Sequence, residues 1–256
     1  MFPKPSGDFE WVQAPWGAAL RCRPLADIAP HYFSTRDLRF DAVPDDPESW
    51  GALARSLDIG IDALVRLRQV HGAQVFVAGN GSRIPEPFPE ADIALTRDPS
   101  VALSVRTDDF VPILLADRRS RSVAAVHAGW KGTAAGAAIA AVRELTSRFG
   151  TRPADVVAAV GPSIGRCCYE VGSDLAGGFA AHPDAARWFS QEARPRLDLW
   201  RATRDQLERA GVPAAQIHVS ALCTFDHPVL FHSYRRDGSR AGRLVAAIRS
   251  APGTTP

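Results

Sequence analysis

Residues 101–127 read VALSVRTDDFVPILLADRRSRSVAAVH, and this stretch decides the fold. It contains three short apolar segments, at residues 101–106, 112–116 and 122–127, with polar turns between them. Short runs rich in valine, isoleucine and leucine are typical of strands that are buried on both faces. The stretch therefore predicts the centre of a covered sheet.

Elements on either side of this stretch extend the pattern. Residues 92–95 and 155–160 are also short and apolar, which predicts two more buried strands. Four further segments have helical signals: residues 45–48 predict a helix start, 62–66 a short helix, 133–148 one long alanine-rich helix, and 198–210 another helix. Strands interspersed with helices indicate a mixed α/β architecture with covered sheets.

Composition favours one globular domain over residues 1–256. The chain has 256 residues, of which 46% are hydrophobic and 23% charged, so it has enough apolar material for a large core. No linker rich in proline, glycine or serine divides it, and no internal repeat is visible. The net charge is only +2 and basic runs are lacking, so we expect no nucleic-acid partner.

The ends and the apolar stretches give no membrane signal. The N-terminal residues MFPKP lack the apolar centre of a signal peptide. The most apolar stretch, residues 132–142, is too short to span a bilayer. Four cysteines, two of them adjacent at Cys167 and Cys168, do not form the pattern of a disulfide framework. We therefore expect a cytoplasmic protein with reduced thiols and no membrane partner.

Three segments place polar side chains where a predicted strand ends. They are residues 69–72 (QVHG), 126–132 (VHAGWKG) and 106–109 (RTDD). Functional groups are common at such positions, because a rigid scaffold holds them beside an open loop. The glycines of the second segment permit a ligand to approach closely, and the helix start that follows it suits an anion.

Four segments of the chain, in this order, closely resemble signature segments of the YfiH family. The matching segments are RQVHG at 68–72, HAGWKGT at 127–133, GPSIGRCCYEV at 161–171 and SYRRDG at 233–238. The resemblance covers residues 30–249 approximately. It implies a single layered α/β/β/α domain with mixed sheets.

The resemblance also implies a site and an activity. The family's metal, usually described as zinc, is bound by two histidines matching His71 and His127 and by a cysteine. Its members act on purine nucleosides by phosphorolysis of adenosine, inosine, guanosine or methylthioadenosine, with some adenosine deamination. An older name, multicopper polyphenol oxidase or laccase-domain protein, has little support here, because seven histidines are too few for such copper clusters.

The chain departs from the family at the third metal ligand. In the segment TDDFVP at 107–112, Phe110 stands at the cysteine position, and a phenyl ring cannot bind zinc. Three explanations remain open. Another group completes the site, namely Asp108, Asp109, Cys167 or Cys168; or the protein keeps phosphorolysis without metal and deamination; or it is a metal-free pseudoenzyme that binds nucleosides or a protein.

Roles for individual residues follow as hypotheses from the matched segments. Arg36 or Arg68 would bind phosphate, because the planar guanidinium suits phosphate oxygens. Gln69 and Trp130 would contact the substrate, the latter by stacking on the base. Catalytic residues for electrostatic or acid–base work would be Asp109, His71 and His127.

Overall fold

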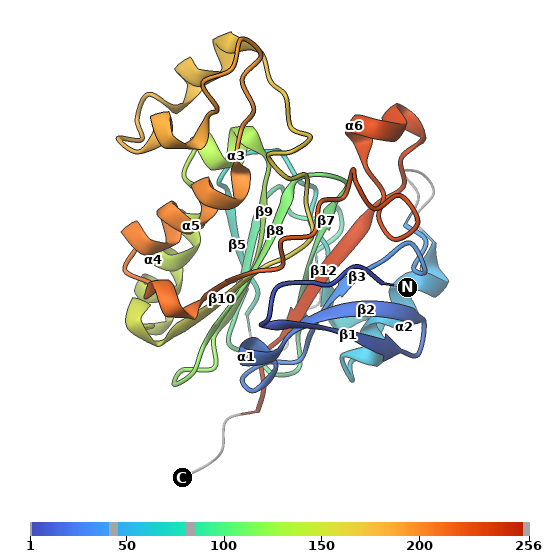
Figure 1. Cartoon of the computed structure of the whole chain (residues 1–256). Helices are drawn as coiled ribbons and strands as arrows, with labels where there is room; N and C mark the ends of the chain where they lie inside the picture. Colours follow the sequence, from blue (N-terminus) through green and yellow to red (C-terminus); the bar gives the residue numbers. More distant parts are fainter. Residues whose placement is uncertain (1, 41–45, 80–84, 253–256) are drawn as a thin grey trace.

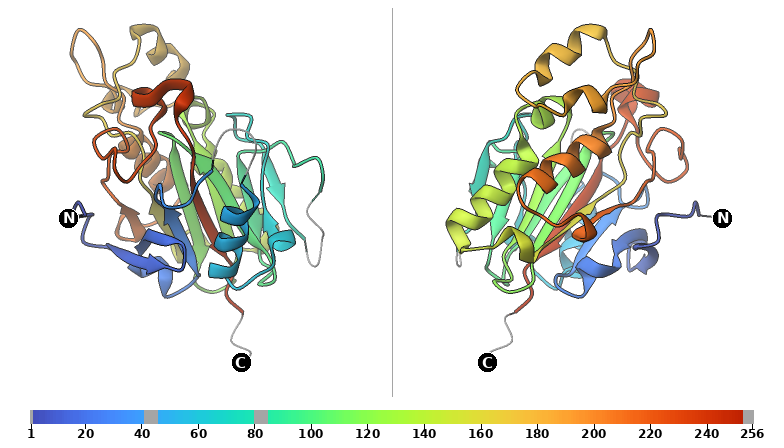
Figure 2. Two further views of the ribbon diagram at one scale, coloured as in Figure 1. Left: turned by 90° about the vertical axis from the view of Figure 1, so that its right-hand side faces the viewer. Right: turned by 60° about the vertical axis from the view of Figure 1, so that its left-hand side comes forward.

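Two six-stranded sheets stack face to face, with helices on both outer faces, in a computed structural model that describes residues 2–40, 46–79 and 85–252 (Figures 1 and 2). The first sheet consists, in spatial order, of β1 (Phe9–Ala14), β2 (Gly17–Cys22), β3 (His31–Ser34), β12 (Leu244–Arg249), β7 (Ala102–Thr107) and β4 (Leu64–Val65). The second consists of β11 (Ile217–Val219), β10 (Val156–Val160), β8 (Val111–Asp117), β9 (Val123–Ala128), β6 (Ile93–Thr96) and β5 (Val75–Val77). The expected α/β/β/α layering is confirmed.

Most neighbouring strands are antiparallel, which the apolar runs did not indicate. The parallel pairs are β10 with β11, β5 with β6, and β4 with β7. The three central runs of the deciding stretch became β7, β8 and β9, and β8 and β9 pair directly with Val111 opposite Ala128. The sheets are therefore mixed, as expected.

Helices cover both outer faces. Next to the second sheet lie α3 (Trp130–Ala134), α4 (Ala137–Phe149) and α5 (Leu199–Arg209), and α2 (Pro47–Ser56) packs against the first sheet (Figure 1). Short helices are α1 (Arg23–Ala26) and α6 (Tyr234–Asp237). The 3₁₀ turns are η1 (Ile61–Ala63), η2 (Pro153–Asp155), η3 (Ser173–Phe179), η4 (Ala185–Trp188), η5 (Ala214–Gln216) and η6 (Gly238–Arg240). Within the described ranges, none of these helices combines the length and hydropathy needed to cross a bilayer.

Three apolar cores explain why the strands lack polar alternation. Along β8, Ile113 and Leu115 face the core under the helices, whereas Leu114 and Ala116 face the core between the sheets. A third core lies between α2 and the first sheet and includes Trp50. Side chains alternate across a strand, so a strand with a core on each side must be apolar throughout. Each fully buried leucine contributes about 2 kcal/mol to folding.

Helix signals were right where a cap was present. The side chain of Asp46 accepts hydrogen bonds from the amides of Glu48 and Ser49, and α2 begins at Pro47 as predicted. The single long helix predicted at 133–148 is wrong, because Gly136 has a φ of 76° and separates α3 from α4. L-residues avoid this left-handed region, and glycine enters it freely.

The short helix predicted at residues 62–66 is also wrong. The chain makes the 3₁₀ turn η1 and then enters β4, whose Leu64 and Val65 pair with Ala102 and Leu103 of β7. Both β4 side chains are fully buried. Pairing with a buried strand outweighs a local helical preference over five residues.

Candidate active site

A buried carboxylate joins the two predicted histidines. His127 lies near the end of β9, and His71 lies in the loop between β4 and β5. Asp92, immediately before β6, accepts a hydrogen bond at Oδ1 from His127 Nδ1 (2.9 Å). The same carboxylate accepts the amide N–H of His71 (3.0 Å, to Oδ1) and that of Gly72 (2.7 Å, to Oδ2). One fully buried side chain therefore positions both histidine segments.

These hydrogen bonds determine the charge of Asp92 and which nitrogen of His127 carries a proton. Burial on its own raises the pKa of Asp92, but the hydrogen bonds from His127 and the two amides outweigh it and leave the pKa below its ordinary value. Because an ionised Asp92 only accepts, Nδ1 of His127 carries a proton, so Nε2 is the nitrogen of His127 that can offer a lone pair. His127 is 3% exposed, and its ring lies next to those of His71 and Phe110.

His71 has an unusual backbone and a lowered basicity. Its φ is 63°, in the left-handed region, and the hydrogen bond from its amide to Asp92 holds it there. Such strain in a residue other than glycine occurs most often at functional sites. Burial, assisted by the neighbouring His127, lowers the pKa of His71. The imidazole of His71 is therefore neutral at neutral pH.

Phe110 fills the space beside both imidazoles. Its ring centroid lies 5.7 Å from that of His71 and 5.5 Å from that of His127, and the two histidine rings are 5.2 Å apart. A Cβ on Gly129 would lie 2.6 Å from the Phe110 ring, so glycine at 129 makes room for the phenyl group. The aromatic ring is thus built into the site.

The donors around His71 and His127 do not fit the three-ligand metal site that the resemblance implied. Asp108 forms an ion pair with Arg243 (3.0 Å), and both oxygens of Asp109 have other partners. Among the described residues, a group of three or more closely spaced metal-binding side chains occurs elsewhere, at Cys167, Cys168, Cys223 and Asp226. The histidine pair supplies two nitrogens and Phe110 supplies no donor.

A cavity of about 510 Å³ opens in front of His71 and Phe110. We call it the histidine cavity; its lining residues are His71, Asp108, Asp109, Phe110, Gly129, Trp130, Lys131, Tyr169, Tyr234, Arg235 and Arg243. The volume is typical of small-molecule sites. Three cationic side chains, those of Lys131, Arg235 and Arg243, line this cavity together with the carboxylates of Asp108 and Asp109. Within the described residues, Arg243 pairs with Asp108, whereas neither Lys131 nor Arg235 forms an ion pair with a carboxylate. The cavity therefore favours an anion.

Asp109 is part of the wall and is firmly held. Its Oδ1 accepts the hydroxyl of Thr224 and its Oδ2 accepts the amide of Arg235, both at 2.7 Å. Burial raises the pKa of Asp109, although these hydrogen bonds lower it in part. The carboxylate consequently joins β8's entry loop to the segment that carries Arg235.

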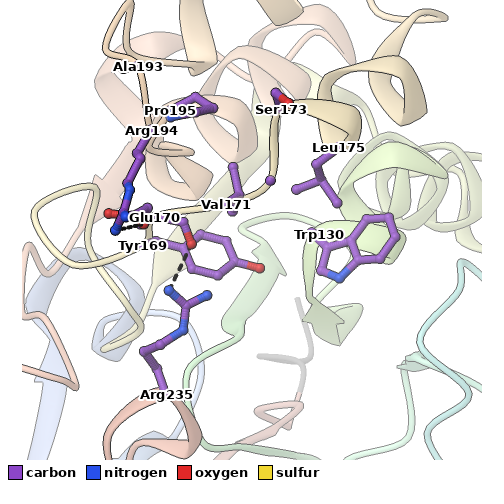
Figure 3. Close-up of a pocket in the computed structure, with 11 residues that line it drawn as sticks. Trp130, Tyr169, Glu170, Val171, Ser173, Leu175, Ala193, Arg194, Pro195 and Arg235 are labelled. Atoms are coloured by element: carbon purple, nitrogen blue, oxygen red, sulfur yellow. Dashed lines mark hydrogen bonds and ion pairs between the residues drawn. The ribbon is translucent and has the colours of Figure 1, made fainter.

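A second cavity, of about 620 Å³, adjoins the first (Figure 3). Trp130, Tyr169 and Arg235 line both cavities. The guanidinium of Arg235 lies 5.1 Å from the Tyr169 ring centroid and donates a hydrogen bond to the carbonyl of Glu170 (2.8 Å). Figure 3 shows the Tyr169 and Trp130 rings on opposite sides of the space below Val171. Aromatic faces thus stand next to the cationic wall.

Three of the residues predicted to bind substrate lie outside both cavity linings. Arg36 donates to the carbonyls of Pro228 and Phe231, and exposed Arg68 pairs with Glu90. Gln69 makes two hydrogen bonds of 2.8 Å to the backbone of Arg106, which ties its loop to β7. Trp130, His71 and Asp109 do line the histidine cavity, and His127 lies directly behind His71.

Sequence reasoning missed Asp92, Lys131 and Arg243 as members of the site. Asp92 was noted only as the start of an apolar strand. An aspartate beside a buried strand is costly to bury without hydrogen-bond partners, and this could have indicated that Asp92 has polar partners in the fold. Lys131 stood inside the motif HAGWKGT and could have been chosen for its charge. Arg243 and Tyr169 are far away in sequence, and nothing local indicates that they meet.

Comparison with known proteins gives consistent findings. Residues 40–251 match the family described as multi-copper polyphenol oxidoreductase laccase. A "Purine nucleoside phosphorylase" of Deinococcus radiodurans is 39% identical over 251 residues, which covers 93% of this chain and 94% of that protein. Another of the same name, from Streptomyces coelicolor, is 40% identical over 214 residues and covers 81% and 85%.

Solved structures agree in fold. The YfiH protein of Bacillus licheniformis superposes with a TM-score of 0.86 at 29% identity, over 96% of this chain and all of that one. YlmD of Geobacillus stearothermophilus superposes with a TM-score of 0.84 at 31% identity, over 94% and 99%.

Proposed function

The chain belongs to the YfiH family, whose description is multi-copper polyphenol oxidoreductase laccase, and on that premise we propose that it is a purine nucleoside phosphorylase. Adenosine, inosine and methylthioadenosine are its expected substrates, with phosphate as the second substrate. The observation that carries the proposal is the histidine cavity, where aromatic rings and the side chains of three cationic residues meet beside a hydrogen-bonded His–Asp pair. Relatives bearing this name support it.

Phosphate would bind to the cationic wall of the histidine cavity. Lys131, Arg235 and Arg243 all line it, and a phosphate placed among them would form charge-assisted hydrogen bonds. This assignment differs from the expectation for Arg36 and Arg68, whose side chains engage carbonyls and Glu90 away from the cavity. Arg243 is also fixed by its ion pair with Asp108, so its guanidinium is oriented before phosphate arrives.

The purine would lie between aromatic faces. Trp130 and Tyr169 border both cavities, and an aromatic ring stacks on any purine with little dependence on its substituents. Phe110 adds a third aromatic surface near His71. A base held in this way leaves the ribose near His71 and the carboxylates of Asp108 and Asp109.

The reaction forms one bond and breaks another. A phosphate oxygen forms a bond to ribose C1′ while the bond from C1′ to the purine nitrogen breaks and its electron pair passes to the base. Carboxylates at 108 and 109 stabilise the positive charge that develops on the sugar ring, with Asp109 also holding Arg235 in place. Neutral His71 donates a hydrogen bond to the departing purine, and His127 with Asp92 supports the His71 ring from behind.

No step of this mechanism uses a metal at His71 and His127. Their two nitrogens lack a third protein donor, because Phe110 occupies the position of the family's cysteine. Deamination requires a metal-activated water at the purine ring. We therefore propose that adenosine yields adenine and ribose 1-phosphate, with no inosine formed by deamination.

The test measures purine release from inosine and adenosine with and without phosphate. The proposal predicts release only with phosphate, together with one ribose 1-phosphate per purine. Replacing Lys131 by Met should raise KM for phosphate roughly 10- to 100-fold, because a charge-assisted hydrogen bond contributes about 1.5–3 kcal/mol. The matched control Arg68→Met removes an exposed cation outside the cavity and should leave KM unchanged.

Other outcomes decide against the proposal. Release that does not depend on phosphate would indicate hydrolysis. Absence of release, with binding of inosine retained, would favour the alternative, a nucleoside-binding protein without catalysis. A larger effect of Arg68→Met than of Lys131→Met would return phosphate binding to the residues expected from sequence.

A further inference from the structure

Three of the four cysteines gather with one aspartate away from the histidine cavity. Cys167, Cys168, Cys223 and Asp226, here called the cysteine cluster, offer four ligand atoms that all lie within 4.8 Å of one another. None of the four lines either cavity of the candidate active site. The fourth cysteine, Cys22, is buried at the end of β2.

Hydrogen bonds inside the cluster already point its donors inward. Cys167 Sγ donates to Asp226 Oδ2 at 3.2 Å, and Cys168 Sγ donates to Asp226 Oδ1 at 3.1 Å. Cys223 is 5% exposed, whereas Cys167 and Asp226 are exposed. The cluster is therefore a pocket of sulfur and oxygen ligands with one side open to solvent, through which an ion can enter.

The backbone around the cluster is held from two directions. Ser163 and Cys223 form a parallel bridge, with the Ser163 amide donating to Leu222 O and the Thr224 amide donating to Ser163 O. The amide of Gly165 donates to Cys223 Sγ at 3.3 Å. Amide donors to sulfur stabilise a thiolate and are common around metal-bound cysteine. The Cys168 amide closes a turn onto Gly165 O, which presents the adjacent cysteines to the cluster.

We propose that Cys167, Cys168, Cys223 and Asp226 bind one divalent zinc ion as a closed, four-coordinate structural site. Thiolate and carboxylate are ligands that zinc accepts, and four protein ligands leave no position for substrate. Two Zn–S bonds of about 2.3 Å at a tetrahedral angle place sulfurs about 3.8 Å apart, so the ligand atoms need to draw together by about 1 Å at most. The protons of the three thiols pass to solvent on binding.

The ion would fasten two segments that reach the active site. One segment, residues 163–168, leads directly to Tyr169, whose ring borders both cavities. The other, residues 223–226, includes Thr224, whose hydroxyl donates to Asp109. A zinc link between them stabilises the wall without entering the cavity. The inference stands on the cluster geometry and does not rest on phosphorolysis.

The sequence makes a decisive spectroscopic test available. Because Phe110 stands where the family has a metal-binding cysteine, the histidine pair offers no sulfur ligand. Any sulfur-to-cobalt charge-transfer absorption must therefore come from cysteines outside that pair. Cobalt(II) replaces zinc in tetrahedral thiolate sites and gives such a band in the near ultraviolet.

The experiment titrates the reduced, metal-free full-length chain with cobalt(II) and then with zinc(II). We expect the charge-transfer band to saturate at one equivalent and to disappear when zinc displaces cobalt. Cys223→Ser and the exposed-site variant Cys167→Ser should each weaken cobalt binding at least tenfold. The matched sulfur control Cys22→Ala and the histidine control His127→Ala should retain the band at full intensity. Circular dichroism checks that each variant is folded.

Three results would overturn the proposal. The first is saturation with cobalt without a charge-transfer band. The second is loss of the band in folded His127→Ala, which would place the metal at the histidine pair. The third combines two observations. Protein purified without reductant has two fewer free thiols, which reduction restores, and the reduced protein binds no metal. Two of the cysteines would then form a disulfide.

Discussion

The histidine pair and the cysteine cluster are two polar regions that differ in the number of donors they present. His71 and His127 supply two nitrogens, and Phe110 occupies the remaining side. The cysteine cluster brings four donors within 4.8 Å. Of the two regions, only the histidine pair borders the cavity that Lys131, Arg235 and Arg243 line. If both proposals hold, metal binding and substrate binding, which the family resemblance placed together, occur at separate places in this chain.

Each region has its own supporting hydrogen bonds. Asp92 serves the histidine pair and accepts from His127 and from two amides. The Gly165 amide serves the cysteine cluster by donating to Cys223. Support by a carboxylate orients an imidazole and fixes which nitrogen carries a proton, whereas support by an amide favours a thiolate. The first arrangement suits proton and hydrogen-bond work, and the second suits metal.

The largest expected effect comes from restoring the missing ligand. Phe110→Cys should give the histidine pair a third donor and strengthen its zinc binding about 100-fold. Structural zinc sites with four ligands have binding free energies of roughly 10–16 kcal/mol, which is about 3 kcal/mol for each ligand. Metal analysis should then find about one zinc more per chain than in the wild type.

Phe110→Ala is the matched control, because it removes the ring without adding a donor. It should leave zinc content unchanged and should destabilise the fold by up to about 3 kcal/mol through loss of packing against both imidazoles. If Phe110→Cys gains no zinc relative to Phe110→Ala, the missing cysteine is not what distinguishes the two regions.

Removing the carboxylate under the histidine pair should have the next largest effect. Asp92→Asn replaces a buried group that accepts three hydrogen bonds, so one donor is left facing an amide NH₂. We expect a loss of about 3 kcal/mol in the free energy of unfolding, measured with urea. Asp155→Asn, at an ion pair with the exposed Arg152, is the control and should change stability by less than about 1 kcal/mol.

A third histidine sets the pH background for both regions. Burial lowers the pKa of His31 from 6.5 to about 4, although a hydrogen bond to Ala29 opposes the shift. As the pH falls, the unfolded chain therefore protonates this histidine before the folded chain does. The free energy of unfolding falls by about 3 kcal/mol as the pH drops from 6.5 towards 4. Urea unfolding at pH 7.5 and 4.5 measures this loss. His31→Gln should flatten it, and an unchanged slope would assign the pH dependence to other groups.

The smallest effect is expected at the break between α3 and α4. Gly136→Ala forces a side chain into the left-handed region and should destabilise the chain by about 1 kcal/mol. The same break orients α3, which carries Trp130 and Lys131 into the cavity, so KM for phosphate should rise no more than a few-fold. Gly177→Ala, where an added Cβ meets open space, is the control.

The layers of the fold were predictable because the strands are short and apolar and the motifs recognisable. Runs such as 112–116 and 155–160 became β8 and β10 with shifts of one residue at their ends. Strand direction was not predictable, because a strand that is buried on both faces has the same apolar composition whether its neighbours are parallel or antiparallel. The helix at 62–66 failed for a similar reason, since pairing with β7 lies outside that segment. The sequence GNG at residues 79–81 also predicts a turn, and residues 80 and 81 lie outside the described residues.

Part of the candidate site followed from sequence as well. His71 and His127 were chosen from motifs at strand ends, and the structure brings their rings within 5.2 Å. Arg36 and Arg68 were chosen for guanidinium chemistry alone, and chemistry without position cannot separate them from Arg243. The partner of Asp92 could not be known, because the hydrogen bond to His127 spans 35 residues. The cysteine cluster likewise depends on a contact between two distant segments.

One measurement tests the separation of metal and substrate most directly: an anomalous difference map at the zinc edge, from crystals grown with zinc and phosphate. We expect a zinc peak enclosed by Cys167, Cys168, Cys223 and Asp226, and phosphate density beside Lys131 and Arg243. A zinc peak between His71 and His127, with the cysteine cluster empty, would contradict it.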